Sequence, residues 1–404
     1  MYEKGMFKNA WIPYKGYYAS PFVRWQGSLA TEHPVKLAGA TVKRWLAERH
    51  PDWDPMQLDY VNCGNTVASK HAFWNGSWVA ALLGAERTVG VWISQACSTG
   101  TTMVYQASMA CEVGSADWVM SIGNDRVSNG PHSVWPNPMG PGGYVEREDW
   151  VMDNFNYDPW GKLPMVTTAD LVGKENGITK EECDELSWVR YQQYQDALKN
   201  DREFQKRYMF PLEVQISKKK TIVVEADEGI TETSPEAIAA LKPVNEDGIH
   251  SFAAQTHPAD GNACLSVCTR EKAKELADPD GPEIQVVSFG YARAAKARMG
   301  AAPVPATEMA LAKAGLTPQD IKVWKTHSPF AVNDVNMAKK LGVDPYKGYN
   351  DYGCSLIYGH PHAATMVRHV VEMIEQLVIE GGGFGAASGC AAGDTGATLV
   401  VKVG

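Results

Sequence analysis

The chain passes from an apolar run into small residues at Val89-Gly90-Val91-Trp92-Ile93-Ser94-Gln95-Ala96-Cys97-Ser98-Thr99-Gly100. The apolar run is typical of a buried strand. Small or apolar residues then recur at Val104, Ala107, Ser108 and Cys111, which is the i, i+3, i+4, i+7 spacing of a helix packed on a sheet. The stretch therefore predicts a strand–turn–helix unit with Cys97 at the turn, and such units build α/β layers.

The same alternation of strand and helix signals continues along the chain. Further buried strands are expected at 118–122 and 284–288, and a helix with one apolar side at 366–377. A chain of 404 residues exceeds the size of a single hydrophobic core, so two or three domains are expected. Cys97 and His360 both follow an apolar run and precede a helix, at strand-to-helix turns, which suggests two duplicated α/β halves.

The segment between about Arg126 and Gly248 differs in composition. It begins rich in Pro, Gly, Asn and aromatic residues, continues as a charged helical stretch at 179–199, and closes with Lys218-Lys219-Lys220 before a strand-like 221–224. We interpret it as an insertion that caps the site. The three lysines could meet phosphates or simply face solvent.

Composition and charge exclude several classes of function. A net charge of −9 gives no basic footprint for nucleic acid, and no apolar run approaches the ~18 residues of a membrane span. Residues 1–15 lack the apolar core of a signal peptide. The eight cysteines show no paired CxxC spacing, so we expect free thiols in a reducing cytoplasm and no metal site.

Three reactive side chains lie in separate runs of small residues. A thiolate at Cys97 would be favoured by the amides and dipole of the following helix, and it could carry an acyl group. His360, in Gly359-His360-Pro361, could remove the thiol proton. Cys390, in the small-residue loop 386–393, could exchange a proton with an α-carbon, while His327 could polarise a thioester oxygen. A buried structural thiol or a core histidine would explain each residue taken singly.

The order and surroundings of these motifs resemble the thiolase family over the whole chain. The resemblance also covers 29–40, 59–65, 123–128, 165–184 and 260–276, and it continues from Asn350-x-x-Gly353 into Gly359-His360-Pro361. It implies an α/β thiolase fold of two duplicated halves in five αβαβα layers, with an inserted cap or loop domain. The expected domains are 1–127 plus 248–278, the cap 128–247, and 279–404.

The resemblance also implies residue roles. Cys97 would be the acyl-carrying nucleophile, His360 its activating base, and Cys390 the general acid/base at the α-carbon. His327, followed by Asn333-Asp334, is similar to the sterol-carrier-protein-type branch; it would form one oxyanion hole with His360. The second hole would use the amides of Cys97 and Ala392. Thr256, His257 and Met165 would contact coenzyme A, which is a co-substrate and not a covalently bound cofactor.

Departures from the family pattern bear on the substrate. The family usually has glycine at the positions of Ala363, Cys354 and one of Ala391 or Ala392, and a small aliphatic residue at His362. The cap contains aromatic residues that could either wall a bulky acyl group or pack between subunits: Trp135, Tyr144, Trp150, Phe155, Tyr157 and Trp160. The chain resembles the thiolases of anaerobic toluene breakdown, which split 2-benzoylsuccinyl-CoA into benzoyl-CoA and succinyl-CoA, and the resemblance implies this preferred substrate. Arg126 or Arg293 would then meet its free carboxylate.

The sequence is also compatible with other substrates and other functions. The substrate could be acetoacetyl-CoA, another short-chain thioester or a steroid 3-oxoacyl-CoA. The chain could instead be a decarboxylating ketosynthase, a hydroxymethylglutaryl-CoA synthase, an inactive CoA-binding scaffold, or a redox protein using Cys97 and Cys390. The resemblance further implies a homodimeric core and a small zinc-containing OB-fold partner, with neither nucleic acid nor membrane as a partner.

Overall fold

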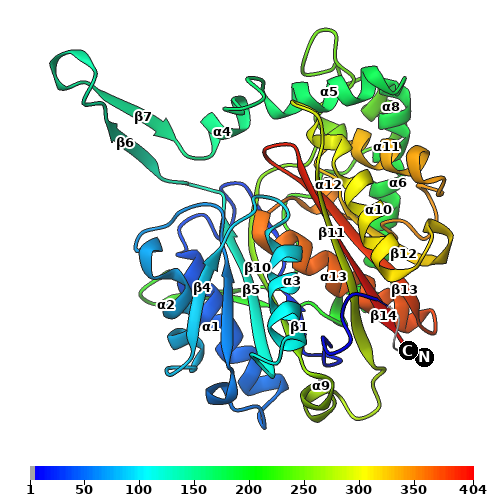
Figure 1. Cartoon of the computed structure of the whole chain (residues 1–404). Helices are drawn as coiled ribbons and strands as arrows, with labels where there is room; N and C mark the ends of the chain where they lie inside the picture. The colour runs from blue at the N-terminus through cyan, green and yellow to red at the C-terminus, as the bar shows by residue number, and fades with distance from the viewer. Residues whose placement is uncertain (1–4) are drawn as a thin grey trace.

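The computed structural model describes residues 5–404, and it consists of two sheets separated and covered by helices (Figure 1). Residues 1–4, which begin both the N-terminal segment and the first expected domain, lie outside this range. The first sheet has the order β1-β10-β5-β3-β4, with β2 also paired to β10. Its strands are β1 (Tyr17–Ala19), β2 (Val23–Arg24), β3 (Tyr60–Gly64), β4 (Val89–Ile93), β5 (Trp118–Arg126) and β10 (Ala259–Cys268).

The second sheet has the order β11-β14-β13-β12. Its strands are β11 (Ile284–Arg293), β12 (Ile321–His327), β13 (Gly383–Ala391) and β14 (Thr395–Val403). The sequence therefore located 89–93, 118–122 and 284–288 correctly as strands. When β2 and β4 are set aside, each sheet has four strands with the same pairing. The first strand along the chain pairs antiparallel with the last, the last pairs antiparallel with the third, and the third pairs parallel with the second. This shared topology confirms the duplication.

Helices form three of the five layers. Between the sheets lie α3 (Thr99–Glu112) and α13 (His362–Ile379), which contact each other and strands of both sheets. The outer face of the first sheet carries α1 (Pro34–Arg49), α2 (Asn75–Leu83) and α9 (Arg270–Leu276); that of the second carries α10 (Pro303–Ala314) and α11 (Ala331–Leu341). Short 3-10 turns lie at Pro55–Gln57, Ala72–Trp74, Pro141–Gly143, Phe252–Ala254, Met299–Ala301 and Pro318–Asp320.

The two central helices approach the facing backbone closely because small residues line the contact. A Cβ on Gly100 of α3 would lie 2.6 Å from the amide nitrogen of Val367, and one on Gly123 of β5 would lie 2.5 Å from the carbonyl oxygen of Ala363. Both contacted atoms belong to the backbone of α13 and cannot move independently of the helix. A side chain at Gly100 or Gly123 would therefore push α13 away from the first sheet. The N-termini of α3 and α13, where Cys97 and His360 lie, are thereby held together.

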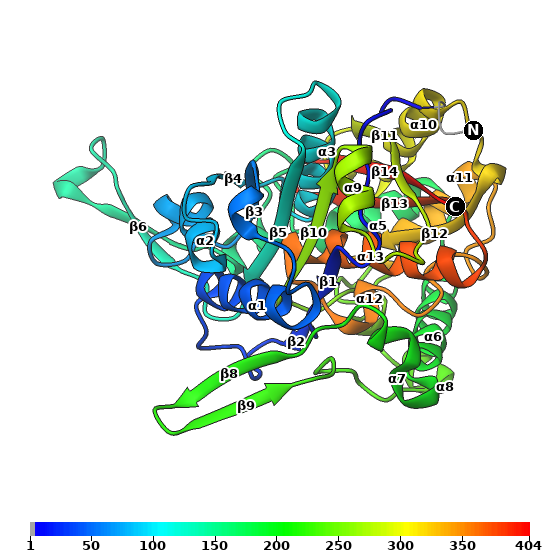
Figure 2. The ribbon, with the colours of Figure 1, turned by 90° about the horizontal axis from the view of Figure 1, so that it is seen from below.

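The inserted segment is an assembly of helices and two hairpins. Its elements are β6 (His132–Pro136), β7 (Val145–Asp149), α4 (Met152–Asn156), α5 (Met165–Glu175), α6 (Lys180–Ala197), α7 (Lys199–Lys206), β8 (Leu212–Ser217), β9 (Lys220–Val224) and α8 (Pro235–Ala239). The β6–β7 hairpin extends away from the body (Figure 1), and β8–β9 runs past α1 (Figure 2). The chain then returns to the first sheet through β10. The three domain boundaries stay a prediction.

Two local expectations were wrong. His360 does not follow a strand, because residues before it form the short helix α12 (Ser355–Tyr358). Cys390 lies in β13 rather than in a loop, and the small residues of this strand face α13: a Cβ on Gly385 would lie 2.6 Å from Met373. Among residues 5–404, no helix combines the length and apolar character required to cross a bilayer.

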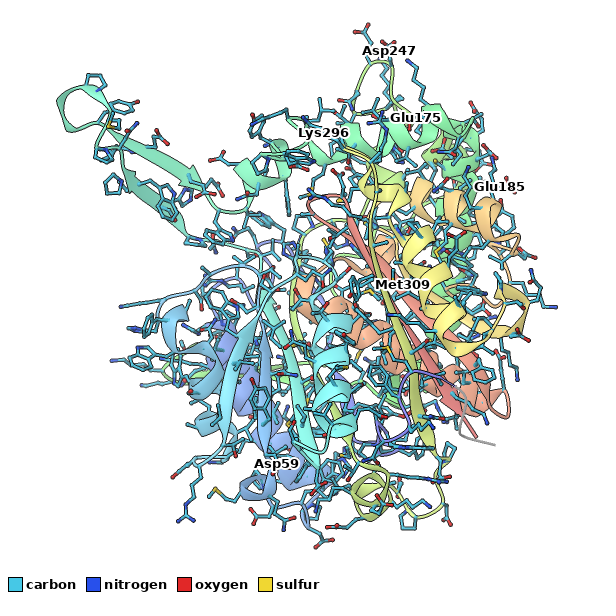
Figure 3. All side chains as sticks on the ribbon, in the orientation of Figure 1. Asp59, Glu175, Glu185, Asp247, Lys296 and Met309 are labelled. Carbon is cyan, nitrogen blue, oxygen red and sulfur yellow. The ribbon has the colours of Figure 1, made fainter. Side chains whose placement is uncertain are left out.

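Charged residues occur both on the surface and in a buried network of ion pairs. Exposed acidic residues such as Asp59, Glu185 and Asp247 project outward from different parts of the surface (Figure 3). Inside, Arg368 of α13 donates to both carboxylate oxygens of Asp227, at 2.7 and 2.8 Å, and to Glu372 at 2.9 Å. Glu372 also accepts from Lys325 of β12 at 3.1 Å. Burial alone would raise the pKa of Glu372, but the two cations outweigh it and the pKa falls to about 2.

We expect Arg368→Met to lower the free energy of unfolding by roughly 3–5 kcal/mol, because it leaves buried carboxylates without their main partner. The matched control is Lys199→Met, which removes an exposed pair with Asp196 and should cost less than about 1 kcal/mol. Urea unfolding followed by circular dichroism measures both. Equal losses in the two variants would contradict a structural role for the buried network.

Candidate active site

The turn that carries Cys97 is fixed by one hydrogen bond within the turn and by others that join it to β13. Ala96 adopts a left-handed conformation with φ of 45°, and the Thr99 hydroxyl accepts from the amide of Gln95 at 2.8 Å. The Ser98 hydroxyl reaches the carbonyl oxygens of Gly389 and Cys390 at 3.1 and 3.2 Å. The strained turn therefore places Cys97 above the N-terminus of α3 and ties it to the end of β13 in the other half.

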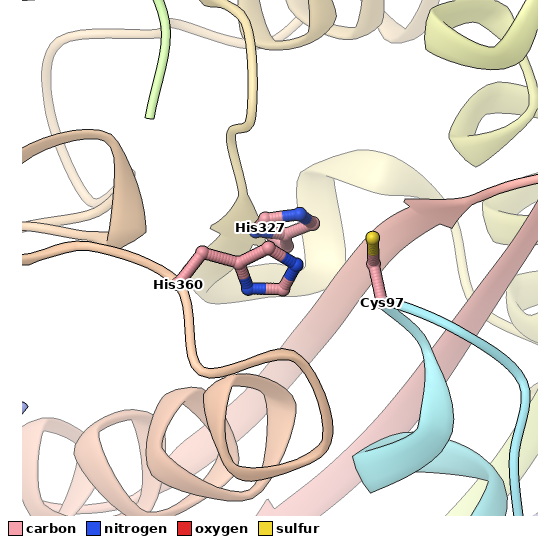
Figure 4. Close-up of side chains that lie close together, drawn as sticks. All are labelled: Cys97, His327 and His360. Atoms are coloured by element: carbon pink, nitrogen blue, oxygen red, sulfur yellow. The ribbon is translucent and has the colours of Figure 1, made fainter. Parts of the chain in front are cut away.

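Two histidines from the second half face Cys97 (Figure 4). His327 ends β12 and His360 follows α12; their rings lie 3.9 Å apart between centroids. The donor atoms of Cys97, His327 and His360 all lie within 4.8 Å of one another. Sulfur and imidazole nitrogen are also zinc ligands, so this cluster is where an added soft metal ion would compete with the chemistry.

Each of these histidines is oriented by a hydroxyl group. Nδ1 of His327 lies 2.7 Å from the Ser355 hydroxyl, and Nδ1 of His360 lies 2.7 Å from the Thr365 hydroxyl. Both Nε2 atoms are buried without a hydrogen-bond partner among residues 5–404. An unpaired buried nitrogen is costly, so both Nε2 atoms are available to a reacting group.

Cys390 lies behind this pair on β13 and is fully buried. The Asn333 side-chain amide donates to its sulfur at 3.1 Å. Burial, together with the nearby Cys97, raises the pKa of Cys390 well above its ordinary value. In the resting site Cys390 is therefore a thiol, which is the form required to give a proton.

The electrostatics of Cys97 differ from the sequence-based expectation of a favoured thiolate. Burial raises the pKa of Cys97 to about 12, although hydrogen bonds from the backbone of Cys97 and Ala392 act in the opposite direction. Burial and the neighbouring His327 hold the pKa of His360 well below its ordinary value. The resting pair is therefore a thiol beside a neutral imidazole, and desolvation outweighs the helix dipole.

A cavity of about 1230 Å³ leads to Cys97 and His360. Met165, Thr256 and His257, the residues expected to contact coenzyme A, all line it. Thr256 is fixed by hydrogen bonds to the backbone of Pro329 and Ser355. The inserted segment supplies much of the wall, including Trp150, Phe155, Val166, Tyr191 and Ile230.

Several expectations about the wall were wrong. Of the six cap aromatics, only Trp150 and Phe155 line the cavity. The other four do not: Trp135 and Tyr144 lie on the exposed β6–β7 hairpin, and Tyr157 and Trp160 are exposed. Arg126 does not line it, because its guanidinium donates to the carbonyls of Glu32 and Asn129. Arg293 instead lies over the Trp160 ring, 5.5 Å from its centroid. The three lysines lie at the β8–β9 turn, away from the cavity lining.

Sequence reasoning missed the partners of the reactive groups. Ser355, Thr365 and Thr66 carry no signal of their own, since their roles arise from contacts between distant segments. Asn333 was noted as part of an Asn-Asp pair, yet its contact with Cys390 could not be read from the sequence. Trp25, Phe252 and Arg24, which also line the cavity, were not anticipated.

Comparison with known proteins gives one consistent family. Residues 16–271 match the family "Thiolase, N-terminal domain" and residues 281–403 match "Thiolase, C-terminal domain". The chain is 27% identical to an acetyl-CoA acetyltransferase of Allochromatium vinosum, over 93% of this chain and 95% of that one. It is 28% identical to a beta-ketoadipyl-CoA thiolase of Pseudomonas knackmussii, over 95% and 96%. The acetyl-CoA acetyltransferase structure of Bacillus anthracis matches with a TM-score of 0.89 at 25% identity, over 99% and 100%.

Because the Cys97 thiol is protonated at rest, its alkylation by iodoacetamide should rise about tenfold per pH unit between about pH 6 and about pH 9, without a plateau. Peptide mapping of Cys97 after timed exposure measures the rate, and Cys97→Ala gives the background. A plateau with an apparent pKa near that of histidine would instead indicate a preformed thiolate–imidazolium pair.

Proposed function

The chain belongs to the thiolase family, and we propose that it transfers an acyl group between Cys97 and coenzyme A in the cleavage of a 3-oxoacyl-CoA. As a thiolase it is an acyltransferase that uses coenzyme A as co-substrate. The observation that carries the residue assignment is the convergence of Cys97, His327 and His360, of which Cys97 and His360 line the cavity, with Cys390 held next to them through Ser98.

In the proposed first half-reaction, His360 Nε2 takes the thiol proton and the sulfur of Cys97 attacks the 3-keto carbon. The carbonyl oxygen gains the negative charge, which the amides of Cys97 and Ala392 stabilise. Collapse of this intermediate breaks the bond between the two carbons. The departing acyl-CoA enolate then takes the Cys390 proton at its α-carbon, and the acyl group remains on Cys97 as a thioester.

In the second half-reaction, coenzyme A loses its proton to Cys390, now a thiolate, and attacks the thioester carbonyl. The amides of Cys97 and Ala392 again stabilise the oxyanion that forms on this carbonyl oxygen, whereas His327 and His360 stabilise the enolate oxygen of the acyl-CoA that departs in the first half-reaction. Cys97 leaves as a thiolate and regains a proton from the His360 imidazolium. Each group returns to its starting protonation state, and the same steps in reverse give a Claisen condensation.

The contact between Asn333 and Cys390 supports a position near the sterol-carrier-protein-type branch, since Asn333 belongs to the Asn-Asp pair that first suggested it. Asp334, the second member, is held by a buried ion pair with Arg190 at 3.0 Å. Both residues lie on α11 directly after His327.

The preferred substrate that we propose is 2-benzoylsuccinyl-CoA. The cavity is large, and Trp25, Trp150 and Phe155 give part of its wall an aromatic surface suited to a benzoyl group. Arg24 is the one lysine or arginine in its lining within residues 5–404, and the Arg24 guanidinium has no hydrogen-bond or ion-pair partner there. It replaces Arg126 and Arg293 as the residue that would meet the free carboxylate.

Acetoacetyl-CoA is the second candidate, because several relatives of similar identity are acetyl-CoA acetyltransferases. A steroid 3-oxoacyl-CoA is the third candidate, because the cavity is large enough for a bulky acyl group. These candidates differ in the acyl group left on the enzyme, which makes the covalent intermediate the decisive observation.

The proposed assembly is a homodimer, and a zinc-containing OB-fold partner stays part of the proposal. β4 is an edge strand of its sheet and exposes Val89 by 61% and Trp92 by 43%, which supports continuation of the sheet into a second copy. All eight cysteines are free, which supports the proposed cytoplasmic location.

The test of the function is intact-protein mass spectrometry with peptide mapping after mixing with each candidate substrate. We expect 2-benzoylsuccinyl-CoA to leave a benzoyl group on Cys97 that coenzyme A discharges. An acetyl adduct from acetoacetyl-CoA alone would preserve the mechanism and overturn the aromatic substrate. Adducts on another residue, or on Cys97→Ala, would overturn the assignment of the nucleophile.

Arg24→Met should raise the KM for 2-benzoylsuccinyl-CoA roughly 10- to 100-fold, which corresponds to losing a hydrogen bond to a charged group. The matched control substrate is 3-oxo-3-phenylpropionyl-CoA, which keeps the phenyl ring and the CoA but lacks the second carboxylate. Its KM should not change. Equal increases for both substrates would place Arg24 against the CoA phosphates instead.

A further inference from the structure

A third histidine lies beside the reacting pair and has no role in the mechanism above. His362 opens α13, two residues after His360; the two rings are 4.7 Å apart between centroids. His362 lines the cavity with Thr66, and the Phe155 ring meets it edge-on at 5.8 Å. Its side chain therefore borders the space available to an acyl group next to Cys97.

The orientation of His362 is set by a buried carboxylate. The Thr66 hydroxyl lies 2.6 Å from Nδ1 of His362 and 3.1 Å from a carboxylate oxygen of Asp125. Asp125 also accepts from the amides of Thr66, Val67 and Ala363, each at 2.9 Å, and from the Asn65 side chain at 3.1 Å. Burial raises the pKa of Asp125 to about 6 although these hydrogen bonds oppose the rise, so above about pH 6 Asp125 is ionised and acts only as an acceptor.

The direction of each hydrogen bond follows from that constraint. Thr66 has a single hydroxyl hydrogen, and an ionised carboxylate can only accept, so this hydrogen points to Asp125. The Thr66 oxygen must then accept from Nδ1–H of His362. A neutral imidazole with its proton on Nδ1 has a lone pair on Nε2. Nε2 has no partner among residues 5–404.

Burial keeps His362 neutral, since it lowers the pKa of the imidazole to about 4. The neighbouring titratable groups are Asp125 and His360, and burial holds His360 neutral as well. The surroundings are otherwise apolar: Trp25, Val67, Trp150, Val151 and Phe155 form one cluster at this part of the wall. Trp150 is itself anchored, because its indole donates to the Thr66 carbonyl at 3.0 Å.

We propose that His362 is a specificity-determining residue whose Nε2 accepts a hydrogen bond from a hydroxyl group on a bulky acyl chain. Asp125 and Thr66 are positioning residues that fix the tautomer. The inference rests on the proposed 2-benzoylsuccinyl-CoA specificity and refines it, because an acceptor beside an apolar wall favours a ring-hydroxylated form of that substrate over the unsubstituted parent.

The test measures binding without turnover, with Cys97→Ser as the parent protein. Dissociation constants are determined by calorimetry for benzoyl-CoA and for its 2-, 3- and 4-hydroxy isomers. At least one isomer should bind about tenfold more tightly than benzoyl-CoA, the effect of one net hydrogen bond. The advantage should disappear in Cys97→Ser/His362→Leu and return in part with His362→Gln, whose amide oxygen can accept.

The positioning residues have their own control pair. Thr66→Val removes the hydroxyl at nearly constant volume and should abolish the preference, whereas Thr66→Ser should retain it. A merely structural role would weaken the binding of all thioesters equally and leave their ratio unchanged. No advantage for any isomer, or an advantage that persists in His362→Leu, would overturn the inference.

Failure of the aromatic substrate is separable from failure of this inference. If acetyl-CoA binds the parent protein more tightly than benzoyl-CoA, the aromatic proposal fails. The acceptor is then tested with butyryl-CoA and 4-hydroxybutyryl-CoA in the same variants. A hydroxyl preference that depends on His362 supports the inference with either pair, and equal affinities in both pairs overturn it.

Discussion

The buried ion-pair network on α13 is the constraint on which the site depends. Arg368 and Glu372 lie one turn apart on this helix, and together they bind Asp227 from the inserted segment and Lys325 from β12. The Arg368 guanidinium also lies 3.7 Å from the centroid of the Tyr358 ring, just before His360. Charges removed from water are costly unless they are paired. Any arrangement that separated α13 from the inserted segment or from β12 would leave a buried charge without its partner. The network therefore fixes the positions of these three parts relative to one another.

The site is a product of the duplication. Cys97 precedes α3 and His360 precedes α13, and these helices occupy equivalent places before the third strand of each sheet. Because both helices lie in the central layer, their N-termini converge at the boundary between the halves. His327 and Cys390 end the neighbouring parallel strands β12 and β13. Neither half contains the full set, so the chemistry exists only when the two halves pack.

The sequence could predict what local patterns encode and no more. Apolar runs gave the strands at 89–93 and 284–288, and runs of small residues marked Cys97 and Cys390 because close backbone approach excludes larger side chains. The prediction that Arg126 or Arg293 meets the substrate carboxylate was wrong, because the partner of a guanidinium depends on contacts between distant segments. The Arg126 guanidinium, for example, donates to the carbonyls of Glu32 and Asn129. For the same reason Ser355 and Thr365, which orient the histidines, have no sequence signature.

The hydrogen-bond partners divide the histidines into two kinds. His327 and His360 each rest on a hydroxyl, from Ser355 and Thr365, that can donate or accept. In the proposed mechanism, such a partner would let His360 take a proton at Nε2 in one step and would let both rings donate from Nε2 in another. His362 also rests on a hydroxyl, but Asp125 fixes the direction of its hydrogen. A hydroxyl that can reorient is therefore suited to proton transfer, whereas one bound to the ionised Asp125 carboxylate keeps Nε2 of His362 an acceptor. This distinction would separate the proposed catalysis from the proposed recognition within one cavity.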